Sequence, residues 1–136
     1  MKVLGIDLGD ARTGVAISDE LKMIAQSHGT IFSKDWQEII TKIKESVEAE
    51  RVETIVIGFP KNMNGTVGER GEKTKEFVKI LEDTINVKTV LWDERLTTVS
   101  AHRVLSEANV RGKKRKKVVD TVSAVFILQC YLDSLV

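Results

Sequence analysis

The sequence predicts an α/β domain in which a mixed, five-stranded sheet carries helices on both faces. Three strand-like runs joined by short turns come first, a pattern typical of an antiparallel meander. Strand-like and helix-like stretches then alternate, which indicates parallel strands joined by crossover helices. The chain has 136 residues, and no repeat or Pro/Ser-rich linker divides it. We therefore expect one domain over residues 1–136.

The first half of the chain supplies three expected strands and one helix. Val3–Gly9 is an apolar run that a glycine ends, and Asp10-Ala11 is typical of a tight turn. Further strands are expected at about Thr13–Ser18 and Ile24–Phe32. Ser33 can cap a helix whose apolar residues recur every 3.6 positions. These apolar residues are Trp36, Ile39, Ile40, Ile43 and Val47.

The second half alternates between the two kinds of element. Glu53–Gly58 holds an unbroken run of branched residues, typical of a strand buried on both faces. Thr66 and Glu69 have capping-box spacing, which predicts a helix through about Thr84. The remaining expected elements are a strand at Val87–Trp92, a helix from Thr97 or Thr98, and a final helix at Val118–Leu135. The final helix is apolar nearly all round, so we expect it to be buried on most sides.

Composition excludes several classes of protein. Hydrophobic residues make up 42% and charged residues 30%, as in ordinary globular domains. Cys130 is the single cysteine and His28 and His102 are the only histidines, so neither a disulfide framework nor a His/Cys metal site is expected. No apolar run approaches the ~20 residues of a membrane span, and the start of the chain lacks a signal-peptide pattern. We expect a cytoplasmic protein with no membrane partner.

The charge distribution is uneven. Residues 111–117 hold six cations and no acid, which leaves 15 basic and 20 acidic residues elsewhere. A basic segment on an acidic body suggests contact with a polyanion, and a solvated loop is the alternative.

Trp36 and Trp92 lie in expected regular elements, so we interpret both as packing residues.

Acidic residues occupy three positions that stability does not explain. Asp7 lies within the first expected strand, where a buried carboxylate costs several kcal/mol unless it is paired or binds a metal. The alternative is that the strand ends early and Asp7 belongs to the turn. Asp93 and Glu94 end another strand, and sites of open α/β sheets gather at such ends. An exposed strand end paired with Arg95 is the alternative, and alternation does not decide which acid faces a site.

The third position is Asp120, near the start of the final expected helix. Favourable placement near a helix N-terminus is the alternative explanation for this acid. Carboxylates without a histidine or cysteine suit a hard cation, Mg²⁺ or Mn²⁺. Two such ions ~3.5–4 Å apart can activate water and stabilise a leaving oxygen in phosphodiester hydrolysis. The acids and the basic segment together predict a metal-dependent phosphodiesterase.

Four motifs carry a resemblance to a known family. They are Gly5–Gly14, Gly58–Thr66, Asp93–Thr98 and the acid Asp120. In this order and over nearly the whole chain, they resemble the YqgF family, also called RuvX-like. The resemblance implies an RNase H-like fold with sheet order 3-2-1-4-5. It further implies a nuclease that acts on the 5′ end of pre-16S ribosomal RNA. Members of this family were earlier described as Holliday junction resolvases.

Carried onto this sequence, the resemblance implies that Asp7, Glu94 and Asp120 are the catalytic, metal-binding acids, with Glu94 preferred to Asp93. Asn64 stands where relatives often have Asp, so it receives no catalytic role. The residues expected to bind nucleic acid are Arg12, Lys61, Asn62, Arg95, Arg111, Lys113, Lys114 and Arg115.

The expected partner is structured RNA, either pre-16S rRNA or the ribosomal particle, or else branched DNA. A Holliday junction resolvase is one alternative, and cutting a junction symmetrically requires two active sites. A non-catalytic RNA- or ribosome-binding module is another. A sugar-kinase-like phosphotransferase is disfavoured because that architecture needs two such domains. The sequence leaves open whether the protein is a monomer or a dimer.

Overall fold

The computed structural model describes residues 1–60, 67–93 and 112–135, and of residues 112–122 it describes the backbone alone. The described elements are β1 (Lys2–Leu8), β2 (Arg12–Ser18), β3 (Ala25–Phe32), α1 (Trp36–Glu50), β4 (Val52–Phe59), α2 (Glu69–Thr84), β5 (Lys88–Asp93) and α4 (Gly112–Ser134). All five strands begin and end within one residue of the expected positions. The helix expected from Thr97 or Thr98 lies outside the described residues.

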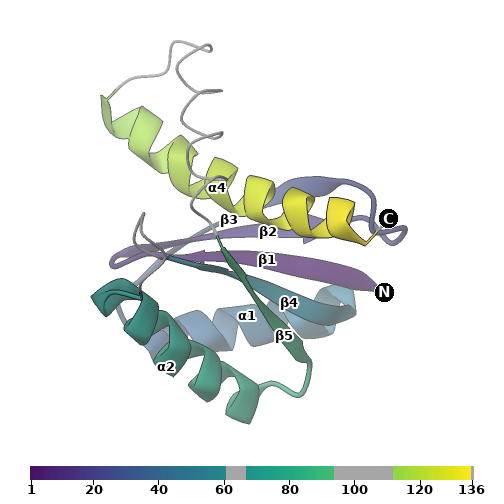
Figure 1. Ribbon diagram of the computed structural model, residues 1–136, viewed down its shortest axis with the longest axis horizontal. Coiled ribbons are helices and arrows are strands. Elements are labelled where there is room, and N and C mark those ends of the chain that lie inside the picture. Colours follow the sequence, from purple (N-terminus) through teal and green to yellow (C-terminus); the bar gives the residue numbers. More distant parts are fainter. Residues whose placement is uncertain (61–66, 94–111, 136) are drawn as a thin grey trace.

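The five strands form one mixed sheet in the order β3-β2-β1-β4-β5. β1, β2 and β3 pair antiparallel, as expected of a meander, while β4 pairs parallel with both β1 and β5. Figure 1 shows α1 and α2 on one face of the sheet and α4 on the other. The predicted fold class, including the strand order, is therefore confirmed. None of the described helices is long and apolar enough to cross a membrane.

Strand alternation divides the apolar residues between two cores. Leu4 and Ile6 of β1 enter the larger core, which lies between the sheet and helices α1 and α2. Val3 enters a smaller core with Ala124 and Leu128 of α4. The central strand therefore presents its even-numbered residues to α1 and α2, and its odd-numbered residues to α4.

Helix α1 begins two residues later than the expected Ser33 cap. Asp35 is the N-cap, and its side chain accepts a hydrogen bond from the Gln37 backbone N–H at 3.0 Å. The Ser33 hydroxyl instead accepts from the Asp35 backbone N–H and donates to Glu38. The expectation that Ser33 caps the helix was wrong, because the Ser33 side chain bonds within the turn that precedes the cap.

Helix α2 ends at Thr84 as expected, but its start differs from the capping-box prediction. Its N-cap is Gly68, which makes no side-chain capping bond, and Glu69 is the first helical residue. A capping box would place Glu69 three positions into the helix. Glu69 and Glu72 instead lie in the first turn, where the positive end of the helix dipole stabilises acidic side chains.

Helix α4 begins at Gly112, six residues before the expected Val118. Lys113, Lys114 and Arg115 are therefore helical, and the expectation that the helix starts only after the basic segment was wrong. Strong intrinsic helix propensity of Lys and Arg favours this extension. Where side chains are described, one stripe of α4 is buried and its other sides are half-exposed down to Leu132, so burial on most sides was also overstated.

Thr13 is a polar residue in the apolar interior. It is fully buried opposite Leu8, and within the described part of the chain its hydroxyl has no hydrogen-bond partner. A buried hydroxyl without a partner carries a desolvation cost that valine, of nearly the same shape, does not.

We therefore expect Thr13→Val to raise the free energy of unfolding by about 1 kcal/mol. Urea denaturation followed by circular dichroism measures this change. An equal or lower stability of the variant would show that the hydroxyl is satisfied in solution.

Candidate active site

Asp7 lies inside β1, near the carboxyl end of the strand. It pairs with Gly14 of β2, so the alternative that assigned Asp7 to a turn is excluded. By alternation it shares the face of Val3 and Gly5, which α4 covers. Its side chain is half-buried. The structure thus places one carboxylate on the α4 face, at the end of the central strand.

Glycines surround Asp7 on this face. Residues directly opposite in an antiparallel pair share a face, so the partner of Asp7 on β2, Gly14, adds no side chain beside it. On β4, Ile57 pairs with Ile6, and Gly58 follows Ile57. Alternation puts Gly58 on the face of Val56, which belongs to the α4 core. The strands on both sides of Asp7 therefore leave room around its carboxylate.

Helix α4 runs antiparallel to β1, so its N-terminal part points toward the end of the strand that carries Asp7 (Figure 1). Ala124 and Leu128 lie against Gly5, while Gln129 accepts a hydrogen bond from the Ala25 backbone N–H, further from that end. Position 120 is one helical turn before Ala124, about 6 Å along the axis. A step of two residues from Gly5 to Asp7 covers a similar distance along the strand.

The same geometry removes the alternative explanation of Asp120. Because α4 begins at Gly112, Asp120 lies more than two turns inside the helix. The helix dipole acts within the first turn, so it does not account for this acid.

The alternation along β5 shows which face of the sheet Asp93 occupies, a question that the sequence left open for Asp93 and Glu94. Val90 and Trp92 belong to the α4 core, and Trp92 packs edge-on against Tyr131 of α4 at 6.0 Å between ring centroids. Thr89 donates a hydrogen bond to Glu82 of α2, on the opposite face. Odd-numbered residues of β5, including the half-buried Asp93, therefore belong to the α2 face. Asp93 lies on the face of the sheet opposite to Asp7.

Among the residues expected to bind nucleic acid, Arg12 is the one whose side chain the structure describes. It is half-buried and opens β2, and by alternation with Gly14 it shares the face of Asp7. Lys113, Lys114 and Arg115 are placed on the first turns of α4 by their backbone. The remaining predicted site residues, which lie outside the described residues, are Lys61, Asn62, Glu94, Arg95 and Arg111.

A metal-binding cluster is not complete within the described side chains. No three His, Cys, Asp or Glu residues gather there in a way that could hold an ion. Two of the three expected ligands, Glu94 and the Asp120 side chain, lie outside the described part of the chain.

Sequence reasoning missed the contribution of Gly5. A Cβ atom at this position would lie 2.8 Å from Leu128 Cβ and 3.2 Å from the Ala124 carbonyl oxygen. Two residues before Asp7 on the same face, Gly5 thus allows α4 to approach the sheet closely. The sequence does show a glycine two residues before Asp7, but its role in packing becomes evident only when the helix that covers this face is known.

We expect Gly5→Ala to lower the free energy of unfolding by about 2 kcal/mol, because the added methyl group overpacks the contact with Leu128. Chemical denaturation measures the loss. Unchanged stability would indicate that α4 lies further from β1 than the structure places it.

The strand order and the helices on both faces of the sheet define an RNase H-like fold. A family model described as "RuvX: Holliday junction resolvase" matches residues 1–134. The chain belongs to this RuvX family.

Several curated relatives match over almost their full length. A protein of Clostridium novyi (strain NT) is 50% identical over 135 residues, covering 99% of this chain and 100% of the relative. One from Acetivibrio thermocellus is 52% identical, covering 98% and 96%. One from Bacillus subtilis (strain 168) is 50% identical, covering 99% of both chains. Each bears the name "Putative pre-16S rRNA nuclease".

Solved structures with the same fold include two resolvases. Thermus thermophilus RuvC in complex with a Holliday junction substrate has a TM-score of 0.57 at 13% identity, covering 99% of this chain and 96% of that one. Fowlpox virus resolvase in complex with Holliday junction DNA has a TM-score of 0.57 at 14% identity, covering 100% and 99%. At these identities the likeness establishes the fold.

Proposed function

We propose that this protein is a divalent-metal-dependent nuclease that hydrolyses phosphodiester bonds in structured RNA, with Asp7, Glu94 and Asp120 as its catalytic acids. The placement of Asp7 carries this proposal. A carboxylate stands on the α4 face at the end of the central strand, between strands whose nearest residues are glycines. Stability alone does not favour an acid there.

The expected donor set fits Mg²⁺ or Mn²⁺. Carboxylate oxygens are ligands of hard cations, and the glycine at position 14 leaves space beside the Asp7 carboxylate. Asp7, Glu94 and Asp120 would hold the ion. A bound cation of this kind supplies Lewis-acid stabilisation of the charge that develops on phosphate oxygens. The alternation of β5 supports Glu94 over Asp93, because Asp93 belongs to the opposite face.

Cations of this chain would hold the substrate beside the acids. Arg12 shares the face of Asp7 and can bind a phosphate through its guanidinium group. Lys113, Lys114 and Arg115 precede Asp120 on the same helix, so the helix that carries one acid also carries a basic segment. Such contacts position the nucleic acid backbone without reading its sequence.

The proposed substrate is pre-16S ribosomal RNA, cut at its 5′ end. The names of the curated relatives support this substrate. A second candidate is the four-way DNA junction, which the family description and the resolvases of the same fold favour. The two substrates make different demands, because symmetric cutting of a junction requires two active sites, one from each of two copies.

We expect Asp7→Asn to reduce cleavage of labelled pre-16S leader RNA by roughly 100-fold or more, since even substitutions behind a metal ligand cost 10- to 100-fold. Cleavage by the wild type should require Mg²⁺ or Mn²⁺ and stop with EDTA. Asp83→Asn, the same chemical change on an exposed site of α2, is the matched control and should retain activity.

Assaying cleavage of a four-way DNA junction in parallel with the RNA distinguishes the two candidate substrates. Cutting of the junction alone would replace the RNA proposal by a resolvase. Binding of either substrate without cutting by the folded, metal-loaded wild type would contradict the nuclease and leave a binding module.

The assignment of Glu94 is tested by a pair of neighbouring variants. Glu94→Gln should lose cleavage as severely as Asp7→Asn, whereas Asp93→Asn should stay close to the wild type because its side chain belongs to the other face. The same cleavage assay measures both. The reverse order of the two losses would make Asp93 the second acid.

A further inference from the structure

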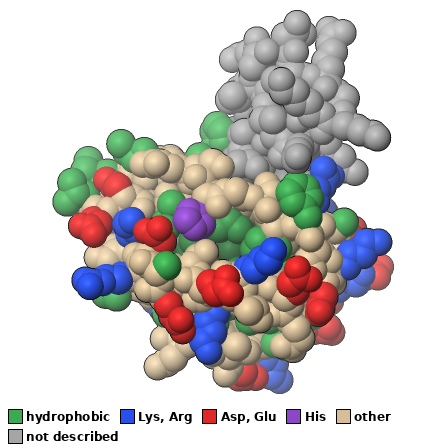
Figure 2. Space-filling model, turned by 180° about the vertical axis from the view of Figure 1, so that it is seen from behind, with side chains coloured by type: hydrophobic (Ala, Val, Ile, Leu, Met, Phe, Trp, Pro, Cys, Tyr) green, Lys and Arg blue, Asp and Glu red, His purple; other side chains and the backbone are tan. Residues whose placement is uncertain are grey.

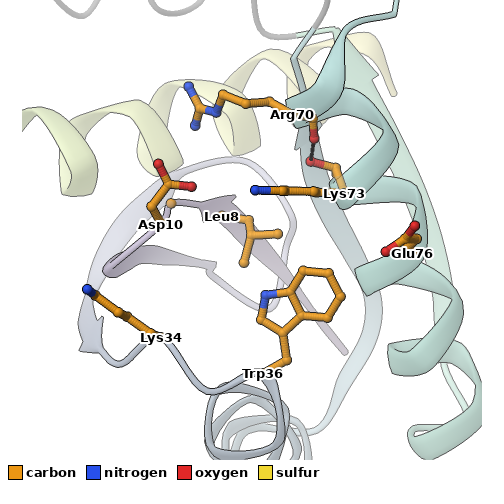
Figure 3. A pocket seen from close by; sticks show the side chains of 9 residues that line it. Leu8, Asp10, Lys34, Trp36, Arg70, Lys73 and Glu76 are labelled. Atoms are coloured by element: carbon orange, nitrogen blue, oxygen red, sulfur yellow. Dashed lines mark hydrogen bonds between the residues drawn. The ribbon is translucent and has the colours of Figure 1, made fainter.

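A pocket lies on the face of the sheet opposite to Asp7 (Figure 3). It has a volume of about 280 Å³, and it opens where the turn after β1, the start of α1 and the first two turns of α2 meet. The lining residues that matter here are Leu8, Asp10, Lys34, Trp36, Arg70 and Lys73. The sequence predicted no binding role for these residues; Trp36 was expected to be a packing residue, and it does pack against the larger core with part of its surface lining the pocket.

Three cations, Lys34, Arg70 and Lys73, line the pocket. Lys73 lies 3.7 Å from Glu69, in an exposed pair one helical turn apart that contributes little. Within the described part of the chain, no ion pair holds Lys34 or Arg70. Figure 3 shows Arg70 and Lys73 extending from α2 across the pocket toward Asp10. Both side chains can therefore reach an anion held between them.

An aromatic surface lies beside these cations. Trp36 packs edge-on against Phe77, with ring centroids 5.5 Å apart and an interplanar angle of 79°. This contact fixes the indole ring. In Figure 3 the ring is seen face-on within the pocket, below Leu8 and Lys73. A rigid aromatic face next to cations is the arrangement on which an unpaired base stacks while its phosphate is held.

We propose that this pocket binds one nucleotide of a single-stranded segment of nucleic acid, with the base on Trp36 and the phosphate between Arg70 and Lys73. The identity of the strand as substrate rests on the proposed function. A volume of about 280 Å³ is just below the range of roughly 300–1,000 Å³ typical of small-ligand sites, so the pocket has room for no more than one nucleotide unit.

The acids of the pocket favour a strand over a free nucleotide. Asp10 and Glu76 line it together with three cations, which leaves a net formal charge of +1. This charge matches one phosphodiester, which is monoanionic, whereas a terminal phosphate carries nearly two charges at neutral pH. The carboxylates can also accept hydrogen bonds from amino groups of a base.

The position of the pocket connects it to the candidate active site. Asp7 and Asp10 are three residues apart, so their Cα atoms lie within about 11 Å of each other. Leu8, between them, points to the pocket face while Asp7 belongs to the α4 face. A strand that passes around the turn after β1 can therefore meet both places.

Fluorescence tests this proposal, because Trp36 and Trp92 are the only tryptophans of the chain. In the Trp92→Phe protein, Trp36 is the single reporter. A single-stranded oligonucleotide of mixed sequence, added in EDTA at low salt, should quench its emission. Arg70→Gln with Lys73→Gln should weaken binding roughly tenfold and reduce the slope of log K against log salt by about 0.7, the contribution of one neutralised phosphate on a single strand.

The matched control is Lys44→Gln with Lys79→Gln, which removes the same charge from exposed positions of α1 and α2 outside the pocket. It should bind as the reporter protein does. Equal weakening by both double variants would overturn the pocket in favour of general electrostatic attraction, and unaltered Trp36 emission would overturn it as well. A mononucleotide that binds as tightly as the oligonucleotide would overturn the strand and indicate a free nucleotide ligand.

The test is independent of catalysis, because EDTA prevents metal-dependent cleavage and binding alone is measured. A wild type that cleaves RNA while Trp36 does not respond would refute the pocket and leave the nuclease intact. A Trp36 response without cleavage would support the pocket and contradict the nuclease.

Discussion

Helix α4 can lie close against the sheet because Gly5, at the centre of β1, has no side chain. The separation that a Cβ atom at this position would have from Leu128 is shorter than carbon atoms tolerate, so a side chain here would force α4 and β1 apart. The candidate site depends on this contact, since α4 carries Asp120 and the basic segment while β1 carries Asp7. Glycines on this face therefore have two effects: Gly5 allows close packing of α4, and Gly14 adds no side chain beside Asp7.

Alternation along β1 places the candidate active site and the pocket around Trp36 on opposite faces of the sheet. Asp7 belongs to the α4 face, and Leu8, the next residue, lines the cationic pocket of the other face. Both sites gather at the carboxyl end of β1, where the chain leaves the sheet and side chains from several elements meet. The large core beneath α1 and α2 holds the strands in register and so fixes where both sites lie.

The strands and their boundaries could be predicted from local patterns, because apolar runs and turn residues are written in adjacent positions. Asp7 could be singled out because an acid inside a strand conflicts with its surroundings. The N-terminal part of α4 could not be predicted, because its charged residues show no apolar periodicity although their helix propensity is high. The face of Asp93 and the pocket around Trp36 also escaped prediction, because both depend on pairing register and on contacts between residues far apart in the chain.

The outer strand β3 carries an irregularity with a consequence for self-association. Its ladder with β2 pairs Val15 with Gly29 and Ala16 with Ser27, so His28 is one residue more than the partner strand accommodates. Such a bulge bends and twists an edge strand, and the unpaired backbone groups beyond it no longer form a flat row. Bulges of this kind are one way in which natural proteins disfavour pairing of an edge strand with a strand of another chain.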